Sequence, residues 1–265
     1  MDKKRILEIR RISFCYGKTR ALDNLSMTIE PGKFYGVVGP NGCGKTTLLD
    51  LLIRNKTPES GTIRYSGRDI KEYKRKRLAR EIALVPQDFY INFPFTVREI
   101  VLMGRHPHIP RFASPSAKDV SIVDEIMEKM EIDGFKEKYV TELSGGEKQR
   151  VVFARAFAQD TPVLILDEGT SNMDIQYTLK TLDMAAESVR MKKRTVIAAL
   201  HNLNLAAAFC DNVVFMKSGR IMSQGNVDDA LNEQNIKDVF QVDSKVYFDG
   251  YSNSKQVVYK RRTQA

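Results

Sequence analysis

The sequence predicts an α/β fold with a mainly parallel β-sheet and helices on both of its faces. Three apolar runs have the length of buried strands, and they lie at residues 34–38, 163–167 and 195–200. Stretches of helical character alternate with these runs, and repeated alternation of strands and helices is typical of parallel sheets. The first run also leads directly into a glycine-rich loop, which opens a helix at 46–50.

Shorter strands are predicted in the first quarter of the chain. Residues 5–12, 27–29 and 62–65 have the composition of strands. We expect Pro31-Gly32 and Ser60-Gly61 to form turns between them, because proline and glycine favour turn conformations.

The middle of the chain has a different character. The basic run 71–80 predicts a helix, and the apolar residues 82–85 predict a strand after it. Between 89 and 116, four prolines and several aromatic residues predict an irregular segment that suits an interaction surface. Residues 118–130 return to helical spacing, and 260–262 predict a frayed polar tail.

The composition limits the function without fixing it. Lysine and arginine number 42 against 33 acidic residues, so the net charge is +9, and 42% of the residues are hydrophobic. No apolar run approaches the roughly 18 residues of a membrane-spanning helix, and we expect no secretory signal at the start. Three cysteines without a CxxC pair argue against a disulfide framework or zinc site and favour a reducing compartment.

The positive charge fits nucleic acid, an anionic membrane surface or ordinary solvated charge. The densest basic run, 71–80, lacks the interleaved aromatic or glycine-rich pattern that base stacking requires. We therefore interpret this run first as a solvated helix face.

The strongest motif is a glycine-rich phosphate loop of the GxxxxGK[ST] type between a strand and a helix. Its glycines let backbone N–H groups approach phosphate oxygens, and the helix N-terminus adds partial positive charge. Lys45 supplies a full charge to the β- and γ-phosphates, and the hydroxyl of Thr46 suits Mg²⁺. The motif consists of Gly39, Pro40, Asn41, Gly42, Cys43, Gly44, Lys45 and Thr46, and Thr47 follows it.

A second motif is the apolar run 163–166, which ends in the paired carboxylates Asp167 and Glu168. Asp167 is placed to hold Mg²⁺ through water, and Glu168 to polarise an attacking water. Phosphoryl transfer needs both, because its catalysis consists mostly of positioning and charge stabilisation.

A third motif lies between these two and begins a helix. Its serine and glutamate have the spacing of a capping box, in which they bond each other's backbone N–H groups. Its glycines before a helix also make it a second anion site. The motif consists of Leu143, Ser144, Gly145, Gly146 and Glu147.

With these three motifs in this order, the chain resembles the ATP-binding subunit of an ABC transporter along nearly its whole length. The resemblance implies a P-loop NTPase (ABC ATPase) core with a mainly parallel sheet, an antiparallel β subdomain and an inserted α-helical subdomain. It implies one domain over 1–265, with the nucleotide-binding core at 1–88 and 159–240, the helical signature subdomain at 89–158 and a C-terminal extension at 241–265.

The resemblance also implies roles for single residues. Tyr16 would stack on adenine, Gln87 would contact Mg²⁺ and the lytic water, and His201 would contact the γ-phosphate. Asp174 lies in a loop that would cross to the partner subunit and, like the phosphate-loop and signature residues, would bind ATP. The implied catalytic residues are Glu168, His201, Gln87 and Lys45, and the implied Mg²⁺ ligands are Thr46, Gln87 and Asp167.

The chain departs from the family pattern at four positions. Gly169 replaces the usual proline after the catalytic glutamate, and Met173 replaces the usual leucine. Lys148 and Asn202 stand where glutamine and aspartate are common. None of the four removes a contact to phosphate, Mg²⁺ or water. Cys43 predicts sensitivity of the ATPase to thiol reagents.

Three segments resemble those of ATP-binding subunits from importers of iron chelates (siderophores), haem and cobalamin; they are 95–108, 200–211 and 239–243. The resemblance implies an ATP-hydrolysing motor subunit in which ATP binding closes a head-to-tail homodimer and hydrolysis resets it. ATP and Mg²⁺ are the implied cofactors. Polytopic permease subunits and, indirectly, a substrate-binding protein are the implied partners, without nucleic acid, at the cytoplasmic face of the cell membrane.

We expect a short cytoplasmic helix of the permease to dock on residues 89–111, next to Gln87. The exposed aromatics and prolines of this segment suit a docking groove, and we expect Met103 and Arg105 to serve the coupling.

Two other functions remain as alternatives. The basic charge is compatible with a soluble ABC-type ATPase that acts on nucleic acid, the ribosome or cofactor assembly. Against it, the sequence contains neither a long coiled-coil insertion nor a second cassette. A small-molecule kinase with a phosphate loop is weaker, because it leaves the motif at 143–147 unexplained.

Overall fold

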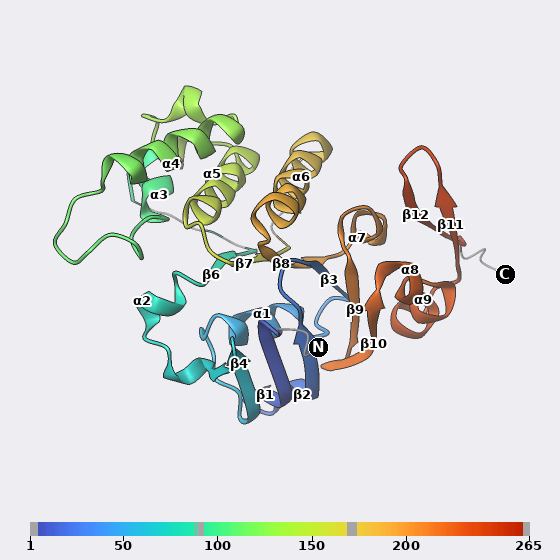
Figure 1. Ribbon diagram of the computed structural model, residues 1–265. Coiled ribbons are helices and arrows are strands. Elements are labelled where there is room, and N and C mark those ends of the chain that lie inside the picture. Colours follow the sequence, from blue (N-terminus) through green and yellow to red (C-terminus); the bar gives the residue numbers. More distant parts are fainter. Residues whose placement is uncertain (1–4, 88, 90–92, 169–173, 262–265) are drawn as a thin grey trace. The chain divides into compact units, whose positions relative to one another are not determined.

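The computed structural model describes residues 5–87, 89, 93–168 and 174–261, and it forms two compact units (Figure 1). The first, here called the β unit, contains Met1–Glu72 and Val189–Ala265. The second, here called the helical unit, contains Tyr73–Ser188.

An antiparallel sheet occupies the N-terminal part of the β unit. Its strands are β1 (Leu7–Tyr16), β2 (Thr19–Ile29), β4 (Ser60–Tyr65) and β5 (Arg68–Asp69), in the order β2-β1-β4-β5. The predicted strands are confirmed, although β1 and β2 are longer than expected. The turn predicted at 60–61 is wrong, because Ser60 pairs with Ser13 across an irregularity in β1 and begins β4.

A parallel sheet forms the rest of the β unit's centre. Strand β3 (Phe34–Val38) pairs in parallel with β8 (Thr195–Leu200) on one side and β9 (Asn212–Lys217) on the other. Every residue of β3 and β8 is buried, as expected for parallel strands that are covered on both faces. Strand β10 (Arg220–Asn226) adds to β9 in antiparallel orientation.

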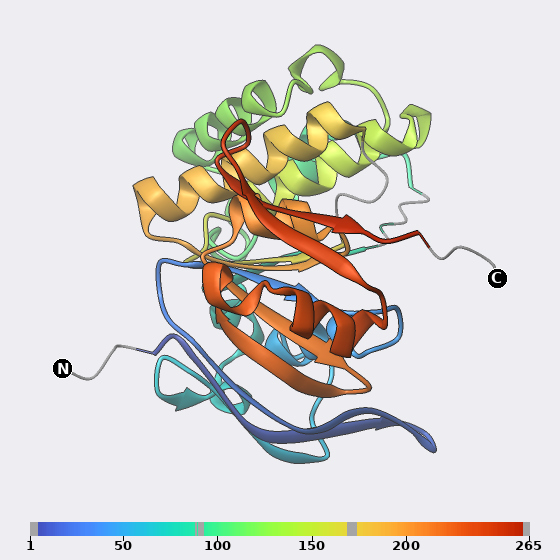
Figure 2. The same cartoon turned by 90° about the vertical axis from the view of Figure 1, so that its right-hand side faces the viewer.

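Helices and a hairpin complete the β unit (Figure 2). The helices are α1 (Lys45–Leu52), α7 (Leu203–Phe209), α8 (Val227–Ala230) and α9 (Glu233–Phe240), and a 3₁₀ turn covers Ile70–Glu72. The C-terminal hairpin, which the sequence did not predict, pairs β11 (Ser244–Asp249) with β12 (Ser254–Tyr259). Its attachment to α7 includes a hydrogen bond from the Val257 N–H to Asn204 Oδ1 at 2.7 Å.

The helical unit combines two parallel strands with a group of helices. Strands β6 (Ile82–Val85) and β7 (Val163–Asp167), both predicted as strands, pair in parallel. Helices α3 (Val97–Met103), α4 (Ala117–Lys129) and α5 (Gly145–Ala158) pack against one another (Figure 1). The unit also contains α2 (Arg75–Leu78), most of α6 (Ile175–Lys192) and 3₁₀ turns at Asp133–Phe135 and Val140–Glu142.

Two expectations for the middle of the chain are met only in part. The basic run forms only the four-residue α2, because Lys74 before it has extended backbone angles. The proline-rich segment is not irregular throughout: Thr96 and Glu99 form a capping box that starts α3.

The fold class predicted from the sequence is confirmed: mainly parallel central strands, an antiparallel sheet and a group of helices are all present. Within the described part of the chain, no helix has the length and apolar character that crossing a bilayer requires.

Candidate functional site

The phosphate loop connects β3 to α1 in the β unit, as the motif predicts. Lys45, the first residue of α1, is buried, and its Nζ donates to the carbonyl oxygen of Gly39 at 3.0 Å and of Pro40 at 3.4 Å. The ammonium group is therefore held inside the curve of the loop, beside the N-terminus of α1. Both features favour an anion at this place.

Two glycines allow this loop conformation. Gly44 has φ +103°, and a Cβ there would lie 2.6 Å from the carbonyl oxygen of Ala21. Gly42 has φ +74°, and a Cβ there would meet nothing within 4 Å. The loop thus packs closely on one side and leaves its tip open to a ligand. The residue set fits a polyphosphate: a buried cation, a helix N-terminus and backbone that an anion can approach closely.

His201 lies at the same edge of the sheet as the phosphate loop. Strands β3 and β8 are parallel, and their last residues, Val38 and Leu200, are partners in the register. Because neighbouring strands are separated by about 4.8 Å, Gly39 and His201 leave the sheet side by side. His201 is exposed, and Asn202 after it caps α7 by accepting from Asn204 N at 2.9 Å.

Tyr16 ends β1 near the start of α1. Its ring is 48% exposed and stands edge-on to Phe14, with ring centroids 5.0 Å apart. Its hydroxyl lies 3.4 Å from Thr47 Oγ1, and the ammonium of Lys56 lies 5.2 Å from its ring centroid. The ring is thus fixed in orientation and open to a planar ligand. Lys56 was missed by the sequence analysis, because no motif links it to Tyr16.

In the helical unit, the parallel pairing of β6 and β7 brings three predicted residues to one sheet edge. Val85 and Leu166 are partners in the register, so the residues that follow them leave the two strands side by side. These residues are the exposed Gln87, the buried Asp167 and the partly buried Glu168.

The backbone of Glu168 is in the left-handed region, with φ +49°. An L-residue with a side chain adopts this region rarely, and such conformations concentrate at functional sites. A carboxylate held this way at the end of a buried strand suits the positioning of a water molecule. Gly169 and Met173, two departures from the family pattern, lie outside the described residues.

The predicted capping box at the start of α5 is confirmed. Glu147 N donates to Ser144 Oγ at 3.3 Å, and a Glu147 carboxylate oxygen accepts from Ser144 N at 2.8 Å and from Ser144 Oγ at 2.7 Å. These bonds, led by the one from the Ser144 hydroxyl, lower the pKa of Glu147. Ser144 and Gly145 are exposed, so the start of α5 faces solvent.

Arg150 anchors this signature helix and was also missed by the sequence analysis. Its guanidinium donates to the carbonyl oxygen of Glu131 at 2.8 Å and lies 4.1 Å from the ring centroid of Tyr177. It therefore joins α5 to the end of α4 and to α6. Asp174 caps α6, since its Oδ1 accepts from Tyr177 N at 3.0 Å, and it is exposed.

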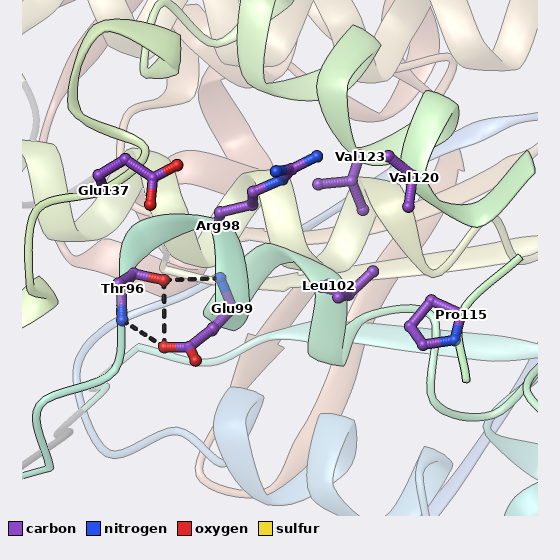
Figure 3. Close-up of a pocket in the computed structure, with 8 residues that line it drawn as sticks. All are labelled: Thr96, Arg98, Glu99, Leu102, Pro115, Val120, Val123 and Glu137. Carbon is purple, nitrogen blue, oxygen red and sulfur yellow. Dashed lines mark hydrogen bonds between the residues drawn. The ribbon is translucent and has the colours of Figure 1, made fainter. Parts of the chain in front are cut away.

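A pocket of about 430 Å³ lies in the helical unit, between α3 and α4 (Figure 3). One end is polar and includes the Thr96–Glu99 capping box, and the other end is apolar, as Figure 3 shows. The lining residues are Thr96, Arg98, Glu99, Leu102, Pro115, Val120, Val123 and Glu137.

Arg105, which we expected to serve coupling at an exposed docking surface, is buried. Its Nε donates to Asp119 Oδ1 at 2.9 Å and its Nη1 to the carbonyl oxygen of Ala158 at 2.7 Å. The residue joins α4 and α5, so this expectation is corrected.

The predicted residues fall into two groups, one in each unit. The phosphate loop, Tyr16 and His201 belong to the β unit. Gln87, Asp167, Glu168, Asp174 and the signature residues belong to the helical unit.

Comparisons with known proteins agree with this set of motifs. A family model described as ABC transporter matches residues 22–171. Among curated relatives, a cobalamin import ATP-binding protein of Halobacterium salinarum is 42% identical over 84% of this chain and 55% of its own length. A petrobactin import ATP-binding protein of Bacillus anthracis is 33% identical over 93% of this chain and 90% of its own length.

A solved structure has the same fold over nearly the whole chain. It is an inward-facing structure of a metal-chelate type ABC transporter, with a TM-score of 0.82 and 27% identity over 97% of this chain and 98% of that one. The chain spans about half the length of the cobalamin relative and about nine tenths of the petrobactin relative.

Proposed function

The chain belongs to the ABC transporter family, and from this premise we propose that it is the ATP-hydrolysing subunit of an importer for an iron–siderophore or a related metal chelate such as haem or cobalamin. Family membership rests on a model match over more than half of the chain. The substrate class is inferred from relatives that import cobalamin and petrobactin, and from the metal-chelate transporter of similar fold.

One observation carries the proposed activity. Each of two parallel strand pairs, β3 with β8 and β6 with β7, delivers residues suited to phosphate chemistry at its carboxyl edge. Ligand sites of open parallel sheets lie at this edge.

In the proposed reaction, the β unit binds the triphosphate. Lys45 and the loop N–H groups neutralise and orient the phosphates, and Tyr16 stacks on adenine. His201 donates a hydrogen bond to the γ-phosphate. Mg²⁺, when bound, would neutralise charge on the β- and γ-phosphates, and Thr46, Gln87 and Asp167 are the residues that would hold it.

The helical unit supplies the water-activating residues. The Glu168 carboxylate accepts a hydrogen bond from water and takes up its proton as the water oxygen attacks the γ-phosphorus. The bond from that phosphorus to the bridging oxygen of ADP breaks at the same time. Gln87 helps to orient the same water.

Assembly completes the proposed site. Each chain carries one phosphate loop and one signature motif, 143–147. The start of α5, where this motif lies, is exposed. A second copy packed head to tail would place its signature motif against the ATP bound to the first copy. ATP binding then closes the homodimer and hydrolysis reopens it.

The permease is proposed to dock on the pocket between α3 and α4. Its apolar end and its polar end suit a short amphipathic helix of a membrane partner. This docking, with the cytoplasmic face of the cell membrane as location, gives the ATPase its coupling to import. The alternative, a soluble ATPase acting on nucleic acid or the ribosome, has no observation in its favour beyond net charge.

The test uses Glu168→Gln and Lys45→Ala. Glu168→Gln keeps the size of the side chain and removes its basicity, so turnover should fall by roughly 10²–10⁴-fold while ATP still binds and a stable dimer forms. Lys45→Ala should weaken ATP binding itself, so that no dimer forms. An ATPase assay and size-exclusion chromatography with ATP measure both effects.

Asp183→Asn is the matched control, because Asp183 is an exposed carboxylate on α6 of the same unit. It should hydrolyse ATP at the wild-type rate. Wild-type turnover in Glu168→Gln would refute the catalytic assignment. Loss of turnover without an ATP-dependent dimer, even with the permease present, would refute the head-to-tail assembly.

A further inference from the structure

A basic surface of the helical unit takes no part in the proposed chemistry. Here called the basic face, it consists of cations from the α2 segment and from the loop between α3 and α4. Residues 73–80 and 106–118 contain no aspartate or glutamate. The basic face is made of Lys74, Arg75, Lys76, Arg77, Arg80 and Arg111, all exposed.

Two side-chain contacts join these segments into one surface. Lys76 Nζ donates to the carbonyl oxygen of Ile109, and Arg80 Nε donates to that of Pro107 at 2.6 Å. The loop is therefore held against α2, and Arg111 follows two residues after the first of these contacts. Cations that are scattered in the sequence thus share one face.

Within the described ranges, no carboxylate pairs with the cations of the basic face. Among the described residues, Lys74, Arg75 and Arg111 make no ion pair, and the guanidinium of Arg77 lies 5.9 Å from the ring centroid of Tyr73. Neighbouring like charges repel one another, so this arrangement costs stability unless an anion is bound.

Phe112, in the loop between α3 and α4, is a separate reason to expect a ligand at the basic face. Its side chain is 94% exposed, and its φ is +67°. A bulky residue in the left-handed region is an outlier, and an aromatic ring in water loses the free energy of burial. Neither the exposure of the ring nor the left-handed backbone of Phe112 stabilises the fold, since the ring covers no core residue. The Arg111 guanidinium lies 4.9 Å from its ring centroid, which places the aromatic residue within the basic face.

We propose that the basic face binds the anionic surface of a lipid bilayer. The cations contact headgroup phosphates, and the Phe112 ring enters the boundary between headgroups and acyl chains. Basic residues next to an exposed aromatic residue have this mode of attachment. A single-stranded nucleic acid would require several stacking aromatics, whereas the basic face offers one. The inference rests on the proposed membrane location, but it requires neither ATP nor the permease.

The experiment is sedimentation of the full chain with vesicles. Vesicles of phosphatidylcholine and phosphatidylglycerol in equal amounts should bind the protein, and phosphatidylcholine alone should not. Each cation near an anionic surface contributes roughly fivefold to binding, so the double variant Lys74→Gln/Arg75→Gln should lower the partition coefficient by roughly 25-fold. Phe112→Ala should lower it by roughly tenfold through lost apolar burial.

The matched control is Lys18→Gln/Lys136→Gln, which removes the same charge at two exposed positions outside the basic face. It should bind as the wild type does, within roughly twofold, because every cation of the basic face and Phe112 stay in place. Thermal unfolding of each variant checks that the fold is kept.

Three results would overturn the proposal: equal binding to neutral and anionic vesicles, equal loss in the two double variants, or binding of a single-stranded oligonucleotide without binding of vesicles. Failure of the proposed ATPase is a separate result. Glu168→Gln is expected to bind vesicles as the wild type does, whatever its turnover.

Discussion

Lys45 holds its ammonium group against two carbonyl oxygens of the loop that it follows. Withdrawing a cation from water is costly unless polar groups replace the lost hydration, and the carbonyls of Gly39 and Pro40 do so here. The loop and its lysine thus form a preorganised unit. Preorganisation of this kind lowers the reorganisation that accompanies binding.

The Tyr16 ring leads to a prediction for the adenine site. Tyr16→Ala should raise the apparent KM for ATP, because stacking of a base on an aromatic ring contributes on the order of 1–3 kcal/mol. Tyr16→Phe should change it little, since the hydroxyl makes only a 3.4 Å contact with Thr47. Steady-state ATPase kinetics over a range of ATP concentrations measure both variants, and equal losses in the two would exclude stacking.

Local patterns made part of the site predictable from the sequence. The capping box of Ser144 and Glu147 is set by residues three apart, and the phosphate loop by eight consecutive residues. Lys56 and Arg150 reach the site through contacts between distant segments, which a single sequence does not encode as a motif. The left-handed backbone of Glu168 likewise has no signature, because glycine or asparagine would be expected there.

At the scale of elements, the longer helices of the middle of the chain form where a capping box is present at the N-terminus. Helix α4 was predicted from its apolar spacing and begins with a capping box of Ser116 and Asp119. Helix α3 carries the same signal at Thr96 and Glu99, which the surrounding prolines obscured. The basic run had helical composition without such a start, and only α2 formed.

Asp119 ties the start of α4 to Arg105 and predicts a pH dependence. The hydrogen bond from the Ser116 hydroxyl, with those from Ser116 N and Arg105, lowers its pKa to about 2. In the unfolded chain an aspartate titrates near its ordinary pKa of about 3.9. Because the folded-state pKa is the lower one, the stabilisation is complete above the unfolded-state pKa and is lost as the pH falls towards 2.

Asp119→Asn should therefore lower the thermal stability at neutral pH, with a free-energy cost on the order of 2 kcal/mol. The difference in Tm between wild type and variant should narrow as the pH is lowered from 6 to 3. Asp124→Asn on the same helix is the control, because Asp124 is half-exposed and its 3.5 Å pair with Arg98 contributes roughly 0–1 kcal/mol. A Tm difference independent of pH would show that the ionised carboxylate is not the source of the stability.

At the scale of the whole chain, the residues of the proposed site are divided between the two units. The β unit carries the residues proposed to bind the nucleotide, and the helical unit carries those proposed to activate water and to meet the partners. The bounds of the helical subdomain, 89–158, stay a prediction. The sequence analysis names a C-terminal extension at 241–265 but no strands within it, so the hairpin of β11 and β12 was missed.

Coupling between the ATPase and the permease gives the last prediction. Val120 lines the pocket between α3 and α4 from one turn into α4 and is partly exposed, so Val120→Asp places a carboxylate where a docked apolar side chain would bury it. A buried carboxylate without a partner opposes association, so chelate uptake by the reconstituted importer should fall by roughly tenfold or more. Basal ATP hydrolysis by the isolated subunit should stay within roughly twofold of wild type, because Val120 belongs to neither group of site residues.

Ser121→Asp is the control: it adds the same charge at the next, exposed position of α4 and should leave uptake unchanged. Equal uptake in the two variants would place the permease elsewhere, and lost hydrolysis in isolated Val120→Asp would show that the pocket maintains the fold instead of receiving a partner.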